Sequence, residues 1–449
     1  EKPIDEIETQ CEQLSQQGQF IVERDVSRWP DGTVSGRYGF RHALYQEVLY
    51  QRLSESRRAR LHQLIGEQEE AAYGERAREM AAELAVHFER GHDVDRAMRY
   101  LHQAGENATK RSAYQEAVML VTRALDLLPS RSEALAGAYQ ELRLRLALGR
   151  SLMLHKGYAA SEVEQVYSQA LALCHAETPP QLRFSVLSGL TTFWIARGEF
   201  VRARELAEQC LALACQMTSP PRQLQIQMLL GMICLYLGEP LRAHGYLESG
   251  IALYETHSTQ SDLAAVGVES LVSCLAYTAV ACWALGYPAQ ASKRSAEALA
   301  LARRYGRPSS LAPALHVACW VHRDRREVEA TGVQVDALTT LCRDYEIPFW
   351  LAWGQTSQGW VLTEQGEVAE GIRLVEDSLA MLQAAGATGG LSDTLALLAE
   401  AYGKLGQLET GFALLTQALS CGTAKGECYY EAEIYRLRGE LLLMQKSHR

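Results

Sequence analysis

Small side chains recur through the second half of this chain with a period of about forty residues. Each of five glycines has a small residue seven positions before it, five after it and twelve after it; these glycines are Gly198, Gly238, Gly286, Gly366 and Gly406. Around Gly198 the three positions hold Thr191, Ala203 and Cys210. A period of this length is typical of stacked supersecondary units, each of which contacts only its neighbours.

The pattern lacks a glycine between Gly286 and Gly366. We take Arg325 as the anchor there, because three alanines keep the small offsets around it; they are Ala318, Ala330 and Ala337. The intervals between successive anchors are then 40, 48, 39, 41 and 40 residues. We assign the single long interval to a polar insertion over residues 255–265.

Two helices that pack closely along their length need small side chains where they cross, since a larger one would push them apart. The offsets therefore predict helical hairpins of the tetratricopeptide kind. The expected fold class is all-α, a right-handed superhelical solenoid of tetratricopeptide-like repeats over residues 95–446. We expect about eight helix pairs and a final unpaired helix.

The first part of the chain has a different pattern. Apolar residues at helical spacing predict a helix over residues 5–17, and two alternating stretches flank a turn at Trp29 to Gly32, where proline and glycine favour a reversal. This order is typical of the end of a winged-helix module, which we place at residues 1–55, followed by a helical linker at 56–94. Because the first helix is acidic, we expect an intramolecular hinge and no DNA contact.

Composition narrows the class of partner. The net charge is −10, whereas nucleic-acid binders usually carry a basic surface, so no nucleic acid is expected. No apolar stretch is long enough for a membrane span, and no membrane partner is expected. The eleven cysteines form no CxxC pair. Reduced thiols in a cytoplasmic protein are therefore expected.

Two blocks carry a family resemblance. The first runs from Phe40 to Leu53 and continues through Arg57 to His62, and the second runs from Ala432 to Leu443. Together with the repeats, they resemble the C-terminal region of bacterial STAND-type signal-transduction ATPases. The subgroup is the one associated with adenylate or guanylate cyclases, or the one similar to LuxR-type maltotriose regulators. The resemblance implies a sensor arm, cut from a larger protein, that contacts an upstream ATPase domain.

The sequence offers no catalytic residues. It has no GxxxxGK followed by Ser or Thr, since Gly403-Lys404 precedes Leu405, and no cyclase metal motif can be placed. His87 and His92 are five residues apart with no fixed third ligand, which favours surface histidines. We expect no metal, no cofactor and no enzymatic activity in this chain.

A second stripe on the first helix of each repeat, at offsets −13, −10, −6 and −3 from the anchor, lines the concave groove in the tetratricopeptide family. We call it the inner stripe. Counted from five anchors it holds no Lys or Arg, which disfavours capture of a terminal carboxylate. Its Met and Trp residues suit an apolar or stacking ligand. The candidate groove residues are Met228, Met232, Trp283, His322, Trp353 and Trp360.

Alternatives remain open at this stage. The groove residues could simply pack against the next repeat. The chain could be a sensor arm that binds a protein partner or a small ligand, a scaffold that always holds one protein, or a piece of a class III cyclase whose catalytic domain lies elsewhere.

Overall fold

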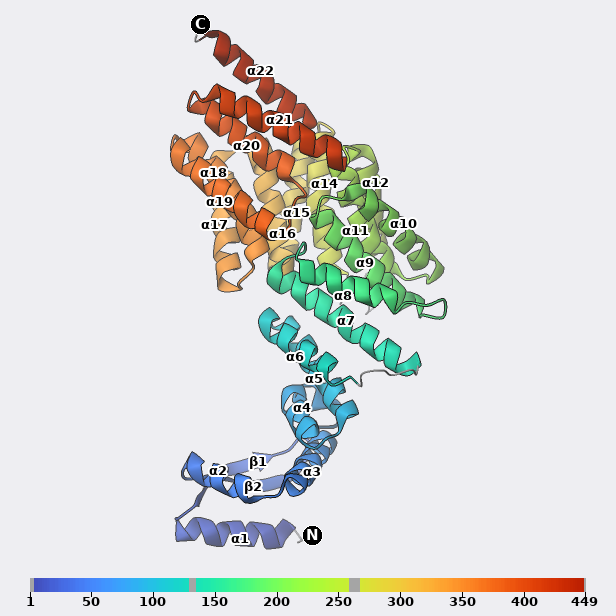
Figure 1. Ribbon diagram of the computed structural model, residues 1–449, viewed down its shortest axis with the longest axis vertical. Helices are drawn as coiled ribbons and strands as arrows, with labels where there is room; N and C mark the ends of the chain where they lie inside the picture. Colours follow the sequence, from blue (N-terminus) through green and yellow to red (C-terminus); the bar gives the residue numbers. More distant parts are fainter. Residues whose placement is uncertain (1–3, 129–134, 258–266, 448–449) are drawn as a thin grey trace. The chain divides into compact units, whose positions relative to one another are not determined.

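The computed structural model of the chain describes residues 4–128, 135–257 and 267–447 (Figure 1). The predicted insertion at 255–265 lies largely outside these residues. The chain divides into two compact units, residues 1–111 with 116–132, and residues 112–115 with 133–449. The predicted boundaries at residues 55 and 94 remain predictions. Each unit is described by itself.

The first unit combines one β-hairpin with helices. Its elements are α1 (Ile4–Gln17), β1 (Ile21–Arg28), β2 (Val34–Phe40), α2 (Ala43–Arg52), α3 (Glu55–Tyr73), the 3-10 helix η1 (Gly74–Arg78), α4 (Ala81–Arg90), α5 (Val94–Lys110) and all but the first two residues of α6 (Tyr114–Asp126). β1 and β2 pair antiparallel, and the amide of Gly32 donates to the carbonyl of Trp29 at 3.0 Å. The predicted helix and hairpin turn are therefore confirmed.

The second unit is a tetratricopeptide-like helical solenoid, as the repeat predicts. Its helices are α7 (Leu135–Lys156), α8 (Ser161–Ala172), α9 (Pro180–Ala196), α10 (Phe200–Gln216), α11 (Pro220–Tyr236), α12 (Pro240–His257), α14 (Val268–Ala284), α15 (Pro288–Tyr305), α16 (Pro308–Asp324), α17 (Val328–Asp344), α18 (Pro348–Gln365), α19 (Val368–Ala384), α20 (Leu391–Lys404), α21 (Leu408–Lys425) and α22 (Glu431–Ser447). Most consecutive helices pack side by side as hairpins (Figure 1).

The five anchor glycines sit in the turns inside these hairpins, all at positive φ, which glycine adopts without steric cost. All fifteen small residues at offsets −7, +5 and +12 from them are buried. Between α18 and α19, for example, a Cβ added to Gly371 would lie 2.5 Å from the carbonyl oxygen of Gly359. Helix packing thus explains why these positions are small.

The anchor at Arg325 is wrong by one residue. Helix α16 ends at Asp324, Arg325 keeps a right-handed conformation (φ −81°), and the left-handed residue is Arg326 (φ 59°). The intervals between left-handed residues become 40, 48, 40, 40 and 40, which is more regular than predicted.

Neighbouring alanines caused the error. The buried positions of this hairpin are Cys319, Thr331 and Leu338, each fully buried, whereas the alanines at 330 and 337 keep some exposure. Leu338 is larger than the pattern allows. It fits because Gly354 of α18 faces it, where an added Cβ would lie 3.3 Å from the leucine side chain.

The solenoid also contacts itself across several repeats. The amides of Thr388 and Gly389, before α20, both donate to the carbonyl of Ala196 at the end of α9, at 3.0 and 3.1 Å. One repeat later, the amide of Cys428 donates to the carbonyl of Tyr236 at the end of α11, at 2.7 Å. The inter-repeat loops at 385–390 and 426–430 therefore bridge to helix ends of much earlier repeats.

Candidate functional site

The corrected anchor changes the composition of the inner stripe. Counted from Arg326, the α16 positions are Pro313, His316, Trp320 and Arg323. Counted from Gly406, α20 contributes Asp393 and Glu400, and one further period places Glu433, Arg436 and Glu440 on α22. The prediction of a stripe without Lys or Arg is thus wrong for α16. Toward the C-terminal end, the stripe is charged.

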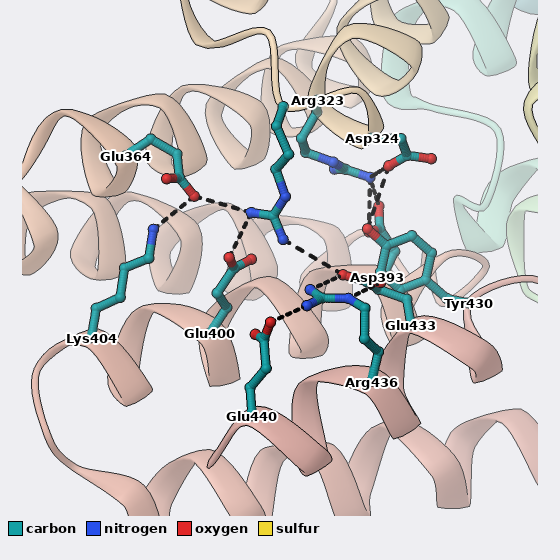
Figure 2. A network of polar contacts seen from close by, with 11 residues as sticks. Arg323, Asp324, Glu364, Asp393, Glu400, Lys404, Tyr430, Glu433, Arg436 and Glu440 are labelled. Atoms are coloured by element: carbon teal, nitrogen blue, oxygen red, sulfur yellow. Dashed lines mark hydrogen bonds and ion pairs between the residues drawn. The ribbon is translucent and has the colours of Figure 1, made fainter. Parts of the chain in front are cut away.

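A buried ion pair joins α16 to α20, two repeats apart. The Arg323 guanidinium Nη2 donates to both carboxylate oxygens of Asp393 at 2.8 Å and lies 3.6 Å from Asp324 (Figure 2). Arg323 is 4 % exposed, and its guanidinium carbon lies 5.9 Å from the ring centroid of Tyr430. An ion pair so far from water depends on complete pairing.

The cluster contains more carboxyl groups than cations. Burial raises the pKa of Asp324 to about 7, although the nearby Arg323 charge opposes the shift. Burial also raises the pKa of Asp393 and of Glu427. Glu427, 5 % exposed, accepts hydrogen bonds from the Gly390 amide at 3.2 Å and from the Ser392 hydroxyl. Within the described residues, no ion pair joins it to a cation.

A cavity of about 20 Å³ lies beside this cluster; its lining residues are Tyr236, His316, Trp320, Trp353, Gly390, Asp393, Glu427, Tyr429 and Tyr430. Neither Trp320 Nε1 nor His316 Nδ1 has a hydrogen-bond partner among the described residues. Burial, followed by the charge of Arg323, lowers the pKa of His316 to about 3, so its imidazole is neutral at physiological pH. The cavity thus combines aromatic walls, carboxyl groups and unpartnered polar atoms.

A second, more exposed network of ion pairs includes stripe residues of α20 and α22 (Figure 2). The Arg326 guanidinium lies 3.1 Å from Glu364, 2.6 Å from Glu400 and 3.6 Å from Glu433. Lys404 contacts Glu364 at 2.7 Å, and Arg436 contacts Glu433 and Glu440. Arg326 stands at positive φ where five other repeats have glycine. Arg326 thus combines a strained backbone conformation with side-chain contacts to three carboxylates.

The predicted groove residues lie in different environments. Trp353 is 7 % exposed and lines the cavity, whereas Trp360, 3 % exposed, packs with Val361 and Leu397. The His322 ring lies 2.6 Å from the Glu327 carboxylate. The other three, Met228, Met232 and Trp283, are partly buried against the hydrophobic core. Their part in binding stays a prediction, and the structure brings Trp353 alone of the six to the cavity lining.

Sequence reasoning missed several cavity residues. His316 and Trp320 would follow from a shift of one residue in the α16 anchor, and Asp393 from counting offsets back from Gly406. Glu427 and Tyr429 lie in the loop before α22, and no repeat position marks them. Only the self-contact of the solenoid brings that loop to α16.

In residues 4–128, 135–257 and 267–447, no group of three or more His, Cys, Asp or Glu side chains is arranged to hold a metal ion. None of the helices in these ranges combines the length and hydropathy that a bilayer span needs.

The comparisons with known sequences give one distant relative. No family model matches the chain. An uncharacterized protein of Rhizobium meliloti (strain 1021) is 24% identical over 413 residues, which cover 91% of this chain and 40% of the relative. The chain therefore spans about two fifths of the length of that protein.

Solved structures share the solenoid fold. The Rap conjugation gene regulator of plasmid pLS20, in complex with the Phr* peptide, has a TM-score of 0.53 at 13% identity, covering 77% of this chain and 92% of that one. A Rap protein complexed with Competence and Sporulation Factor has a TM-score of 0.51 at 10% identity, covering 77% and 98%. At such low identity the likeness concerns the fold.

Proposed function

We propose that this chain is a non-enzymatic sensor and interaction arm, and that it receives a partner or small ligand on the inner stripe of α16, α20 and α22. The observation that carries the proposal is the buried cluster of Arg323, Asp393 and Glu427. Buried charges and buried polar atoms without a partner cost free energy of folding. A protein with well-packed apolar residues in place of a buried ion pair is often as stable, or more stable. Stability therefore does not explain why these groups are present, whereas ligand recognition does.

The two Rap structures support this proposal by analogy of fold. Each was solved in a complex, one of them with a peptide. Because one fold hosts many functions, the analogy supports binding as a class and names no ligand.

A sensing mechanism requires two arrangements that a ligand can distinguish. The loops at 385–390 and 426–430 provide one suitable element. A few hydrogen bonds hold them to α9 and α11, and Gly390 and Glu427 of the same loops line the cavity. A ligand at the cavity would therefore strengthen or weaken the contacts of these loops with α9 and α11.

The parent protein belongs to the same proposal. The resemblance of residues 40–62 and 432–443 supports an arm of a STAND-type ATPase, in which the hairpin and α2 are the end of a winged-helix hinge. The greater length of the Rhizobium relative is compatible with further domains. A cyclase parent is the alternative within this class, and a constitutive scaffold is the alternative outside it.

Hydrogen–deuterium exchange of the full chain tests the proposal. We would add small-molecule, peptide and protein fractions of a cell extract and follow exchange along the chain. Protection or exposure at 385–390, 426–430 and the C-terminal half of α16 is expected. Changes confined to the outer helices would contradict the inner stripe, and a copurifying protein without any ligand response would favour the scaffold. ATP hydrolysis or cyclic nucleotide synthesis by this chain would contradict a non-enzymatic arm.

A further inference from the structure

The cavity beside Glu427 has the size of a single small group. Its volume of about 20 Å³ is close to what one water molecule needs. An ammonium group has nearly the same size. Tyr236, His316 and Tyr429 are only partly buried, whereas the other residues of the lining are buried.

Three side chains that line the cavity, Glu427, Asp393 and His316, can accept hydrogen bonds. Glu427 and Asp393 supply carboxylate oxygens, and Glu427 has no cation partner among the described residues. His316 is neutral, and its unpartnered Nδ1 can accept a hydrogen bond in the tautomer that protonates Nε2. An ammonium group has three donors and no acceptor, which matches these groups.

The walls of the cavity are aromatic. Rings of Trp320, Trp353, Tyr236, Tyr429 and Tyr430 surround it. The faces of such rings attract cations, most strongly where water is excluded. A cavity with aromatic walls and a carboxylate at one side is thus suited to a small cationic group.

The indole nitrogen of Trp320 gives separate information about the ligand, because this buried donor needs an acceptor. Trp320 is 6 % exposed and lines the cavity, and its Nε1 donor has no acceptor in the described part of the chain. A buried donor of this kind normally has a partner. A ligand would meet this requirement if it carried an oxygen acceptor close to its ammonium group.

We propose that this cavity receives the primary ammonium group of a ligand that carries a neighbouring carbonyl, the chemistry shared by a free amino acid and the N-terminal residue of a peptide. This inference rests on the proposed function and names the ligand class for the same site. The ammonium group contacts Glu427, Asp393 and His316, and the carbonyl oxygen accepts from Trp320 Nε1.

Titration of the full chain with three probes tests the inference. The probes are alaninamide, tri-alanine amide and its N-acetylated form, followed by calorimetry and by the fluorescence of Trp320 and Trp353. Binding is expected for the free amines and not for the acetylated peptide. Equal binding of alaninamide and the peptide would show that the first residue alone is recognised, as a free amino-acid ligand requires, and binding of the peptide alone would identify a peptide N-terminus.

Variants assign the binding to the cavity. Glu427→Gln keeps the shape and removes the charge, and we expect affinity to fall by about tenfold or more, since hydrogen bonds to charged groups are the stronger ones. Glu376→Gln, on the exposed face of α19, is the matched control and should bind normally. Trp320→Phe removes a donor without breaking any hydrogen bond of the described residues, so it should fold and bind more weakly.

The inference is overturned if the acetylated peptide binds as well as the free one, if no probe binds, or if Glu427→Gln and Trp320→Phe leave the affinity unchanged. Should exchange protection at 385–390 and 426–430 appear with some other ligand while the amines fail, the inference fails and the proposed function stands.

Discussion

Arg323 and Asp393 lie 70 residues apart in the sequence, yet one guanidinium nitrogen donates to both carboxylate oxygens at 2.8 Å. Helices α17, α18 and α19 lie between α16 and α20 along the chain, and both residues are on the inner stripe. The pair therefore ties two repeats that a simple stack would connect only through the repeat between them.

Removing one partner of this pair should be costly. Arg323→Met leaves Asp393 buried without its cation, and we expect a loss of about 3 to 5 kcal/mol in the free energy of unfolding. Urea denaturation followed by circular dichroism measures it. The double variant Arg323→Met with Asp393→Leu should recover much of the loss, because no buried charge then lacks its partner. A double variant as unstable as the single one would contradict this account.

Stability should depend on pH through Asp324. Its pKa is raised to about 7 in the folded chain from an ordinary value of 3.8, so the folded state holds more protons than the unfolded state between these values. The free energy of unfolding therefore falls as pH rises from about 4 to 7, by roughly 1.4 kcal/mol per pH unit at most, and levels off above.

Asp324→Asn should flatten this pH dependence. The variant removes the ionisable group, while Asp393 and Glu427, whose pKa values burial also raises, keep a residual slope of the same sign. Urea midpoints at pH 5 and pH 8 compare the two proteins. An unchanged difference between the midpoints would show that Asp324 does not carry the dependence.

Arg326 combines a backbone cost with side-chain ion pairs. Arg326→Ala keeps the positive φ and loses the contacts to Glu364, Glu400 and Glu433, whereas Arg326→Gly loses the contacts and relieves the strain. We expect the glycine variant to be more stable than the alanine variant by about 1 kcal/mol in urea denaturation. Gly366→Ala is the matched control, because no atom lies within 4 Å of an added Cβ and only the φ of 96° disfavours a side chain there. This variant should lose a similar amount of free energy of unfolding.

The corrected register of the α16–α17 hairpin can be tested by overpacking. Thr331 is fully buried and Ala330 is not, so Thr331→Leu should destabilise by about 1 to 3 kcal/mol and Ala330→Leu by much less. Ala243→Leu, at the equivalent position of the α11–α12 hairpin, should behave like Thr331→Leu. Thermal unfolding distinguishes the two registers, because the opposite order would restore Arg325 as the anchor.

The contact between the loop at 385–390 and the end of α9 depends on a close backbone approach at Gly389. A Cβ there would lie 2.5 Å from the carbonyl oxygen of Ile195, so Gly389→Ala should displace the loop and break its hydrogen bonds to Ala196. Faster amide exchange at 385–390 is the expected result. Gly439→Ala is the control, because nothing lies within 4 Å of its Cβ position. Equal exchange in both variants would contradict the close approach.

The sequence by itself determined the repeat. Small residues at fixed offsets follow from contacts inside one helical hairpin, and these contacts join residues close in the sequence, so a periodic count finds them. The same count failed at Arg326, because Ala318, Ala330 and Ala337 satisfy the criterion of small size one position too early. Residue size alone does not distinguish a buried alanine from a half-exposed one.

The tertiary structure decided the site. Glu427 and Tyr429 reach α16 because the solenoid turns far enough for late loops to meet early helix ends, as the Cys428 contact with Tyr236 shows. The turn accumulates from small rotations between successive repeats, and no single repeat encodes its sum. The hairpins were therefore predictable from local pattern, whereas the buried cluster depends on contacts between repeats distant in the sequence.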